Sequence, residues 1–127
     1  MGALILFEDE SAGRFEPVAL TRSVARLRLG MCTHRERWRR IFPERPASVL
    51  VREYLARVEE AAGGWAGVNA VPDDDVLFVS AAAARPSADT EAAVRGLESG
   101  QAVLSSGRLL AARAGGDAAQ RLAAALR

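Results

Sequence analysis

The sequence predicts one α/β domain over residues 1–127, with helices on both faces of a mostly parallel sheet. Two short apolar runs without polar alternation, at 3–7 and 76–79, are typical of strands buried on both faces. Helical patterns alternate with these runs, which is the order found in α/β folds. The 127 residues fit a single domain, and no internal repeat or low-complexity linker divides them.

Two helices are expected between the first strand and residue 43. Apolar residues at helical spacing predict a helix over 24–30 that stops at its glycine. Thr33 and Glu36 fit a capping box that starts the second helix. Trp38 is expected in its buried face, and Pro43 ends it because proline cannot continue a helix.

The middle of the chain predicts a further strand and helix. Residues 48–51 read as a second short strand, and residues 53–62 as a helix before a pair of glycines. The inward face of this helix is expected to carry Tyr54, Leu55 and Val58.

The last third predicts a helix, a hairpin and a final helix. Ser87 is the expected N-cap of a helix that buries Val94 and Leu97. Two apolar stretches around residues 105–108 read as a hairpin. Asp117 is expected to cap the last helix, and the chain stops within this helical pattern, which suits the N-terminal part of a longer protein.

Composition excludes several classes of function. The formal net charge is only +1, whereas a dedicated nucleic-acid binder carries a large basic excess. All 17 basic residues are Arg, so neither a Schiff base nor a Walker-type phosphate lysine is available. One cysteine cannot form an internal disulfide, and the N-terminal apolar run is too short for a signal peptide or membrane span. A reducing cytoplasm is therefore the expected location.

Candidate binding residues follow two of the expected strands. Open α/β sheets bind ligands beyond the carboxyl ends of their strands, which here means the loops at 8–22 and 80–86. A carboxylate at such an end can hold a divalent cation, and an arginine can grip a phosphate with two hydrogen bonds. The alternative is a solvated loop whose charges pair with one another.

Other polar residues read more simply as structure. Asp73 to Asp75 precede a strand, so we expect turn formers and solvated charge at the amino end of the sheet. The arginines at 35–40 predict a solvated basic helix face. His34 lacks partners with metal-ligand spacing and reads as a surface residue, and Cys32 reads as a small core residue.

Several stretches together resemble a known family. They are Leu4-Ile5-Leu6-Phe7-Glu8-Asp9, Pro17-Val18-Ala19-Leu20-Thr21-Arg22-Ser23-Val24-Ala25, Leu27-Arg28-Leu29-Gly30 and Thr33-His34-Arg35-Glu36-Arg37-Trp38. The series resembles the N-terminal domain of sugar nucleotidyltransferases related to the bifunctional N-acetylglucosamine-1-phosphate uridyltransferase/acetyltransferase. The family pattern has PLTxTRPVAELRxG followed by TIREKW, and weaker similarity continues to residue 112.

The resemblance implies a Rossmann-like three-layer sandwich of the nucleotide-diphospho-sugar transferase type. It implies transfer of a nucleotidyl group from a nucleoside triphosphate to a sugar 1-phosphate, with Mg²⁺ as cofactor and a left-handed β-helix in the longer relatives. The catalytic residues would be Arg22 and Arg28, which would hold phosphates. Substrate would contact Arg14, Thr21 and Ser80, and Asp9 would bind the metal.

The chain departs from the family pattern at the loops that carry the chemistry. Well-characterised members have a GxGTR loop followed by a lysine, where this chain has Ser11-Ala12-Gly13-Arg14 and no lysine. They also have a metal-binding aspartate after the middle strand, where Ser80 and Ala81 stand. These departures favour an alternative: a non-catalytic module that binds a nucleotide sugar or a partner. A fragment without autonomous activity, forming a homo-oligomer through an unpaired sheet edge, is the third hypothesis.

Overall fold

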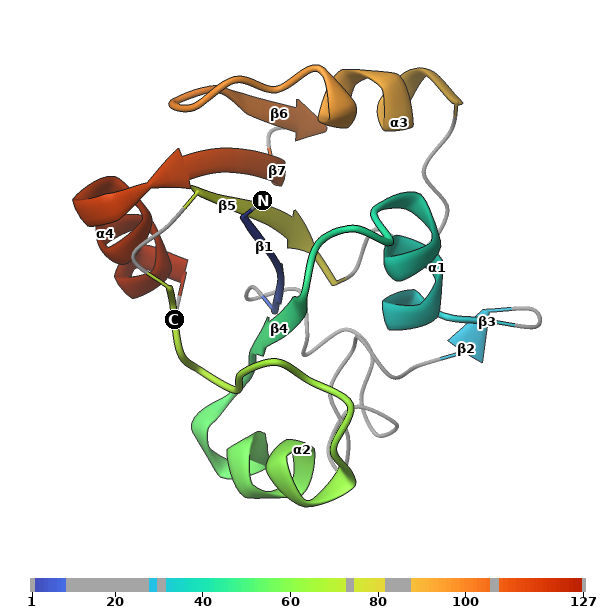
Figure 1. Cartoon of the computed structure of the whole chain (residues 1–127), viewed down its shortest axis with the longest axis vertical. Coiled ribbons are helices and arrows are strands. Elements are labelled where there is room, and N and C mark those ends of the chain that lie inside the picture. The colour runs from blue at the N-terminus through green and yellow to red at the C-terminus, as the bar shows by residue number, and fades with distance from the viewer. Residues whose placement is uncertain are drawn as a thin grey trace.

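The computed structural model has an α/β fold built around one mixed sheet (Figure 1). Among the described residues, five strands lie in the order β4-β1-β5-β7-β6. They are β1 (Ala3–Phe7), β4 (Ala47–Leu50), β5 (Asp75–Ser80), β6 (Ala102–Ser105) and β7 (Arg108–Gly115). The structure describes residues 2–8, 28–29, 32–72, 75–81, 88–105 and 108–126, with the backbone alone at 28, 29, 32, 34 and 105.

The sheet is half parallel and half antiparallel, so the prediction of a mostly parallel sheet was wrong. β1 pairs in parallel with both β4 and β5. The predicted hairpin of β6 and β7 does form, and β7 then pairs antiparallel with β5. The hairpin therefore extends the parallel part of the sheet by two antiparallel strands.

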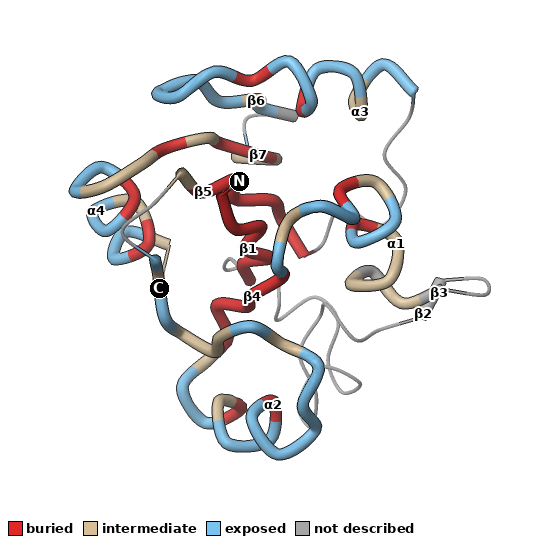
Figure 2. Tube along the Cα trace, in the orientation of Figure 1, coloured by how far each residue is buried: buried red, intermediate tan, exposed pale blue. Residues whose placement is uncertain are grey.

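Helices pack on both faces of this sheet. The described residues form α1 (His34–Ile41), α2 (Ala56–Ala62), α3 (Ala88–Arg95) and α4 (Gly116–Leu126), with the short 3-10 helix η4 (Glu53–Leu55) before α2. Trp38 of α1 and Val94 of α3 join the core on one face, together with Leu4 and Leu6. Alanines of α4 pack with Ile5, Phe7 and Phe78 on the other. The burial expected for β1 is confirmed, since all its residues are buried (Figure 2).

The local patterns explain most helix boundaries. The capping box is confirmed, because the backbone N–H of Glu36 donates to Oγ1 of Thr33 at 3.1 Å. α1 ends at Ile41, two residues before Pro43. The prediction of a helix over 24–30 was wrong at its end, because Arg28–Leu29 (β2) pairs with Cys32–Thr33 (β3) as a small antiparallel ribbon. Residues 24–27 lie outside the described part.

The inward face of α2 differs from the prediction. Leu55 is buried as expected, but Tyr54 and Val58 are exposed. Glu59, four residues after Leu55, is buried in their place, and the indole N–H of Trp65 donates to its Oε2 at 2.6 Å. This hydrogen bond offsets part of the cost of burying the carboxylate. Asp117 also differs slightly, since it lies in the first turn of α4 and not before it.

A short segment covers the outer edge of β4. Backbone hydrogen bonds join Ala66 N–H to the carbonyl of Ala47 and Asn69 N–H to the carbonyl of Val49. The side chain of Asn69 accepts from the backbone N–H of Val51 at 2.8 Å. The edge that remains for pairing in the described part is that of β6, where Leu104 is exposed. None of the helices in the described ranges is long and apolar enough to span a bilayer.

An ion-pair cluster joins the amino ends of β4 and β5 to the carboxyl end of β7. Arg113 donates from Nε and Nη2 to the two carboxylate oxygens of Asp75, both at 2.9 Å, and Arg45 reaches the same carboxylate at 3.3 Å. The prediction that Asp75 carries only solvated charge was therefore wrong. The cluster is tightly built, because a Cβ at Gly2 would overlap the carbonyl oxygen of Asp75.

Candidate functional site

The carboxyl ends of the three parallel strands meet at one edge of the sheet. β1 lies between β4 and β5, so the chain moves to one side of β1 and then to the other. In α/β folds, ligands bind beyond the carboxyl ends of the strands at such a reversal of strand order. Main-chain hydrogen bonds hold the edge together: Glu8 N–H donates to the carbonyl of Leu50, and Ala81 N–H to that of Phe7.

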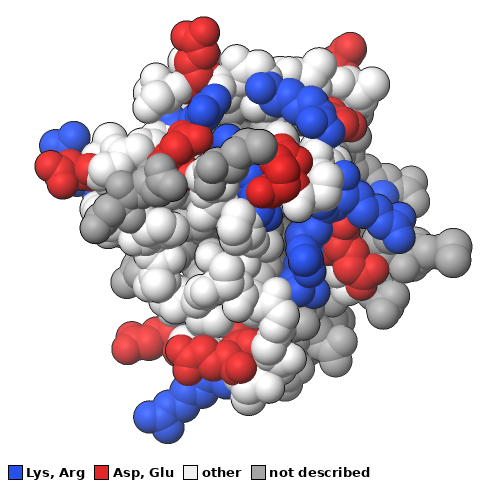
Figure 3. All heavy atoms as spheres, in the orientation of Figure 1, with Lys and Arg blue, Asp and Glu red and all other residues white. Residues whose placement is uncertain are grey.

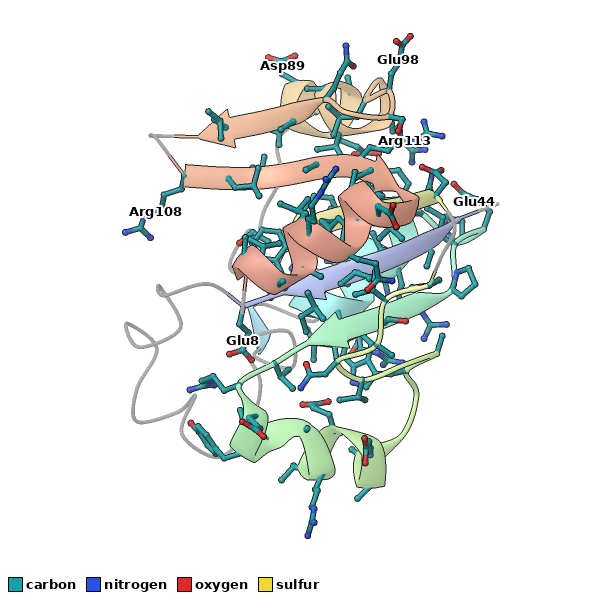
Figure 4. The ribbon with its side chains drawn as sticks, turned by 90° about the vertical axis from the view of Figure 1, so that its left-hand side faces the viewer. Glu8, Glu44, Asp89, Glu98, Arg108 and Arg113 are labelled. Carbon is teal, nitrogen blue, oxygen red and sulfur yellow. The ribbon has the colours of Figure 1, made fainter. Side chains whose placement is uncertain are left out.

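A buried ion pair lies at this edge. The carboxylate Oε2 of Glu8, directly after β1, is 2.8 Å from Nε of Arg52, two residues after β4. The side chain of Glu8 is only 2% exposed and that of Arg52 is 23% exposed. Figure 4 shows Glu8 at the opposite end of the sheet from Arg113. The Glu8 carboxylate is thus covered by a guanidinium.

Arg52 also contacts an exposed aromatic ring. Its Nη1 donates to the hydroxyl of Tyr54 at 3.0 Å, and its guanidinium carbon lies 5.4 Å from the ring centroid. Tyr54 belongs to η4, directly beyond the carboxyl end of β4, and is 58% exposed. Glu8, Arg52 and Tyr54 therefore form a connected row from the centre of the edge outward.

Ser80 lies at the carboxyl end of β5. It is buried, and it is opposite Phe7 in the register of β1 and β5. The next residue, Ala81, is also buried. Ser80 therefore lies at the carboxyl edge of the parallel strands, and its contact with a substrate stays a prediction.

The other five predicted site residues lie in segments whose side chains are not described. Asp9, Arg14, Thr21 and Arg22 lie outside the described residues. Arg28 is in β2, but only its backbone is described. The roles assigned to these five residues stay predictions.

Sequence reasoning missed Arg52 and Tyr54. The sequence predicts binding residues after the first strand and after residues 76–79, and it also predicts a strand at 48–51. The end of that third strand was the signal that could have identified Arg52 and Tyr54, because parallel neighbours end at the same edge of a sheet.

The buried carboxylate at this edge is already paired with an arginine. Mg²⁺ takes oxygen ligands, commonly one or two carboxylates together with substrate phosphates. At this edge Glu8 is buried and pairs with Arg52, while Glu53 of η4 is exposed. No group of three potential His, Cys, Asp or Glu ligands occurs in the described ranges.

The amino edge of the sheet has a different character. The Arg113 hydrogen bonds, helped by the charge of Arg45 and opposed by partial burial, lower the pKa of Asp75 below its ordinary value of 3.8. An open hollow of about 370 Å³ beside β1 and β4 is lined mostly by small or apolar residues, including Ala3, Gly67 and Val71. This hollow lacks a cationic lining that could hold phosphates.

The visible surface carries mixed charge. Figure 3 shows basic and acidic side chains close to one another over the top and right of the face in view. This pattern agrees with the formal net charge of +1. The face in view therefore gives no sign of the broad basic surface that nucleic-acid binding requires.

Comparison with models of protein families gives a match over nearly the whole chain. Residues 4–127 match the family described as sugar nucleotidyl transferase. No curated protein and no solved structure matched the chain. The matched range includes all the described strands, apart from Ala3 at the start of β1. It also includes the ion pair of Glu8 and Arg52.

Proposed function

Because the chain belongs to the sugar nucleotidyl transferase family, we propose that it is a nucleotidyltransferase-like domain acting on a nucleoside triphosphate and a sugar 1-phosphate. We further propose the Rossmann-like sandwich of the nucleotide-diphospho-sugar transferases and a relationship to the bifunctional uridyltransferase/acetyltransferase. The match over residues 4–127 is the observation that carries this proposal. The reversal of strand order at β1 supports it, because nucleotides bind α/β sheets beyond the carboxyl ends of the strands at such points.

The proposed reaction is a displacement at the α-phosphorus. A phosphate oxygen of the sugar 1-phosphate forms a bond to that phosphorus, and the bond to the bridging oxygen breaks to release pyrophosphate. Catalysis of such a step depends mainly on positioning and on neutralising phosphate charge. We assign the charge neutralisation to Arg22 and Arg28.

Further contacts complete the proposed site. Arg14, Thr21 and Ser80 would contact the substrates, and Asp9 would hold Mg²⁺, which neutralises phosphate charge when bound. We place this activity in the cytoplasm, where a chain with one cysteine meets reducing conditions. A homo-oligomer, if it forms by strand pairing, would use β6, because residues 66–69 cover β4.

One observation favours the second candidate, a non-catalytic module that binds a nucleotide sugar. β5 ends at Ser80 and is followed by Ala81, so its described end offers no carboxylate, and the whole chain has no lysine. Loss of these groups would remove turnover and still leave the carboxyl edge of the sheet able to bind a ligand.

Two measurements test the proposal. Isothermal titration with a nucleoside triphosphate and Mg²⁺ is expected to show binding, weakened in Arg22→Ala by about 1.5–3 kcal/mol, the value of a hydrogen bond to a charged group. Release of pyrophosphate after addition of sugar 1-phosphate then separates the two candidates. Binding with turnover supports the transferase, and binding of a nucleotide sugar without turnover supports the module. Absence of any heat with the wild-type protein would contradict both.

A further inference from the structure

Tyr54 presents an aromatic ring to solvent beyond the carboxyl end of β4, at the outer side of the candidate edge. More than half of its surface is exposed, and it follows the carboxyl end of β4 by four residues. Among the described residues, Arg52 alone makes a hydrogen bond or ring contact with it. One side of the ring is therefore supported by protein, and much of the remainder is open.

The ring is held in position by a chain of contacts. Arg52 donates to the Tyr54 hydroxyl at 3.0 Å and lies 2.8 Å from the buried carboxylate of Glu8. The backbone N–H of Glu8 in turn donates a hydrogen bond to the carbonyl of Leu50 in β4. A side chain fixed before binding loses less conformational entropy when a ligand arrives.

The exposed aromatic ring of Tyr54 suits one class of ligand better than others. The positive charge of Arg52 is balanced by Glu8, so Arg52 is poorly suited to a phosphate. A flat, uncharged aromatic surface suits the π-face of a nucleobase, and base–aromatic stacking tolerates any of the bases. A guanidinium beside the ring adds a cation–π contribution to such a stack.

We propose that Tyr54 is the stacking platform for the base of the nucleotide bound at the carboxyl edge of β4 and β1, with Arg52 as its positioning residue. This inference rests on the proposed function and adds the position of the nucleoside to it. The base lies over Tyr54, and the phosphates extend toward the end of β1.

Titration calorimetry with two ligands tests the assignment. One ligand is a magnesium nucleoside triphosphate, measured for ATP and UTP, and the other is magnesium tripolyphosphate, which has no base. Tyr54→Ala is expected to weaken binding of both nucleotides about 5- to 150-fold, the range for loss of one stacked base. Its affinity for tripolyphosphate should stay unchanged. Tyr54→Phe keeps the ring and should retain most of the affinity.

A matched control comes from the same surface. Val58 is 47% exposed on the adjacent helix, and Val58→Ala should bind nucleotide like the wild type. Circular dichroism checks that each variant is folded. Unchanged nucleotide binding in Tyr54→Ala would overturn the stacking role and leave the proposed function intact. Equal weakening for nucleotide and tripolyphosphate would also overturn it, because the ring would then act on the phosphate site. Wild-type protein that binds no nucleotide would overturn the proposed function as well.

Discussion

The Nε atom of Arg52 lies 2.8 Å from the carboxylate Oε2 of Glu8, and this ion pair ties the carboxyl end of β4 to that of β1. Both side chains are mostly buried, so water screens the pair less than it would screen a surface pair. The ion pair therefore fixes the shape of the edge at which we propose that the nucleotide binds.

Neutralising Glu8 should destabilise the domain. Glu8→Gln keeps the side-chain volume but leaves the mostly buried Arg52 without its carboxylate, which we expect to lower the free energy of unfolding by about 1–3 kcal/mol. Urea denaturation followed by circular dichroism measures this change. Glu53→Gln, at a neighbouring exposed position, is the control and should change stability by less than about 0.5 kcal/mol. Equal stability of the two variants would contradict the structural role of the pair.

The Asp75 cluster predicts a loss of stability in acid. Because Arg113 lowers the pKa of Asp75, the folded protein keeps this carboxylate ionised at a pH where the unfolded chain is protonated. Its contribution is complete above the ordinary value of 3.8 and is lost as pH falls through the lower folded pKa. The side chains of Arg113 and Asp75 are each about one-third exposed, so we expect the ion pair to contribute about 1 kcal/mol to the free energy of unfolding.

Asp75→Asn tests this pH dependence. Urea unfolding from about pH 5 to about pH 3 should show a smaller difference between wild type and variant at the acid end. Asp89→Asn, at an exposed position of α3, is the control. A wild-type-to-variant difference that stays constant over this range would show that Arg113 does not perturb Asp75 in solution.

Asn69 should be sensitive to replacement for two separable reasons. Its side chain accepts the N–H of Val51, and its φ of 53° lies in the left-handed region. Asn69→Gly loses the hydrogen bond, at a cost of about 1–3 kcal/mol. Asn69→Ala should cost about 1 kcal/mol more, because alanine resists this backbone conformation. Thermal unfolding that ranks alanine at or above glycine in stability would refute this reading.

Trp38 is expected to be the most costly core position on α1. It is fully buried and stacks on Phe42 with ring centroids 6.4 Å apart. Trp38→Ala should lower the free energy of unfolding by about 3–5 kcal/mol, measured by chemical denaturation. Arg39→Ala changes an exposed neighbour and should cost less than about 0.5 kcal/mol. A similar loss in both variants would mean that Trp38 is not part of the core.

Local sequence patterns predict the elements that are formed by interactions between residues close together in the chain. The hydroxyl of Thr33 caps the helix three residues before Glu36, so both ends of the interaction can be read from the sequence. The strand pairing of β7 cannot be read in this way. It brings together residues 38 positions apart, such as Asp75 and Arg113, and no local signal gives the direction of such pairing.

The same distinction applies to the candidate site. Ser80 ends β5, and the sequence pattern predicts a buried strand at 76–79 directly before it. The role of Arg52 depends on Glu8, which is distant in sequence and meets it only because β4 lies beside β1. Glu59 was missed for a similar reason, since its burial depends on the indole N–H of Trp65.

The most direct test of the proposed nucleotide site is to locate bound nucleotide on the sheet. A ¹⁵N–¹H correlation spectrum recorded during titration with a magnesium nucleoside triphosphate reports each backbone amide separately. The account predicts the largest shifts at Glu8, Arg52 and Ala81, at the carboxyl ends of the parallel strands. Shifts confined to the opposite edge, around Ser48 and Gly67, would contradict it.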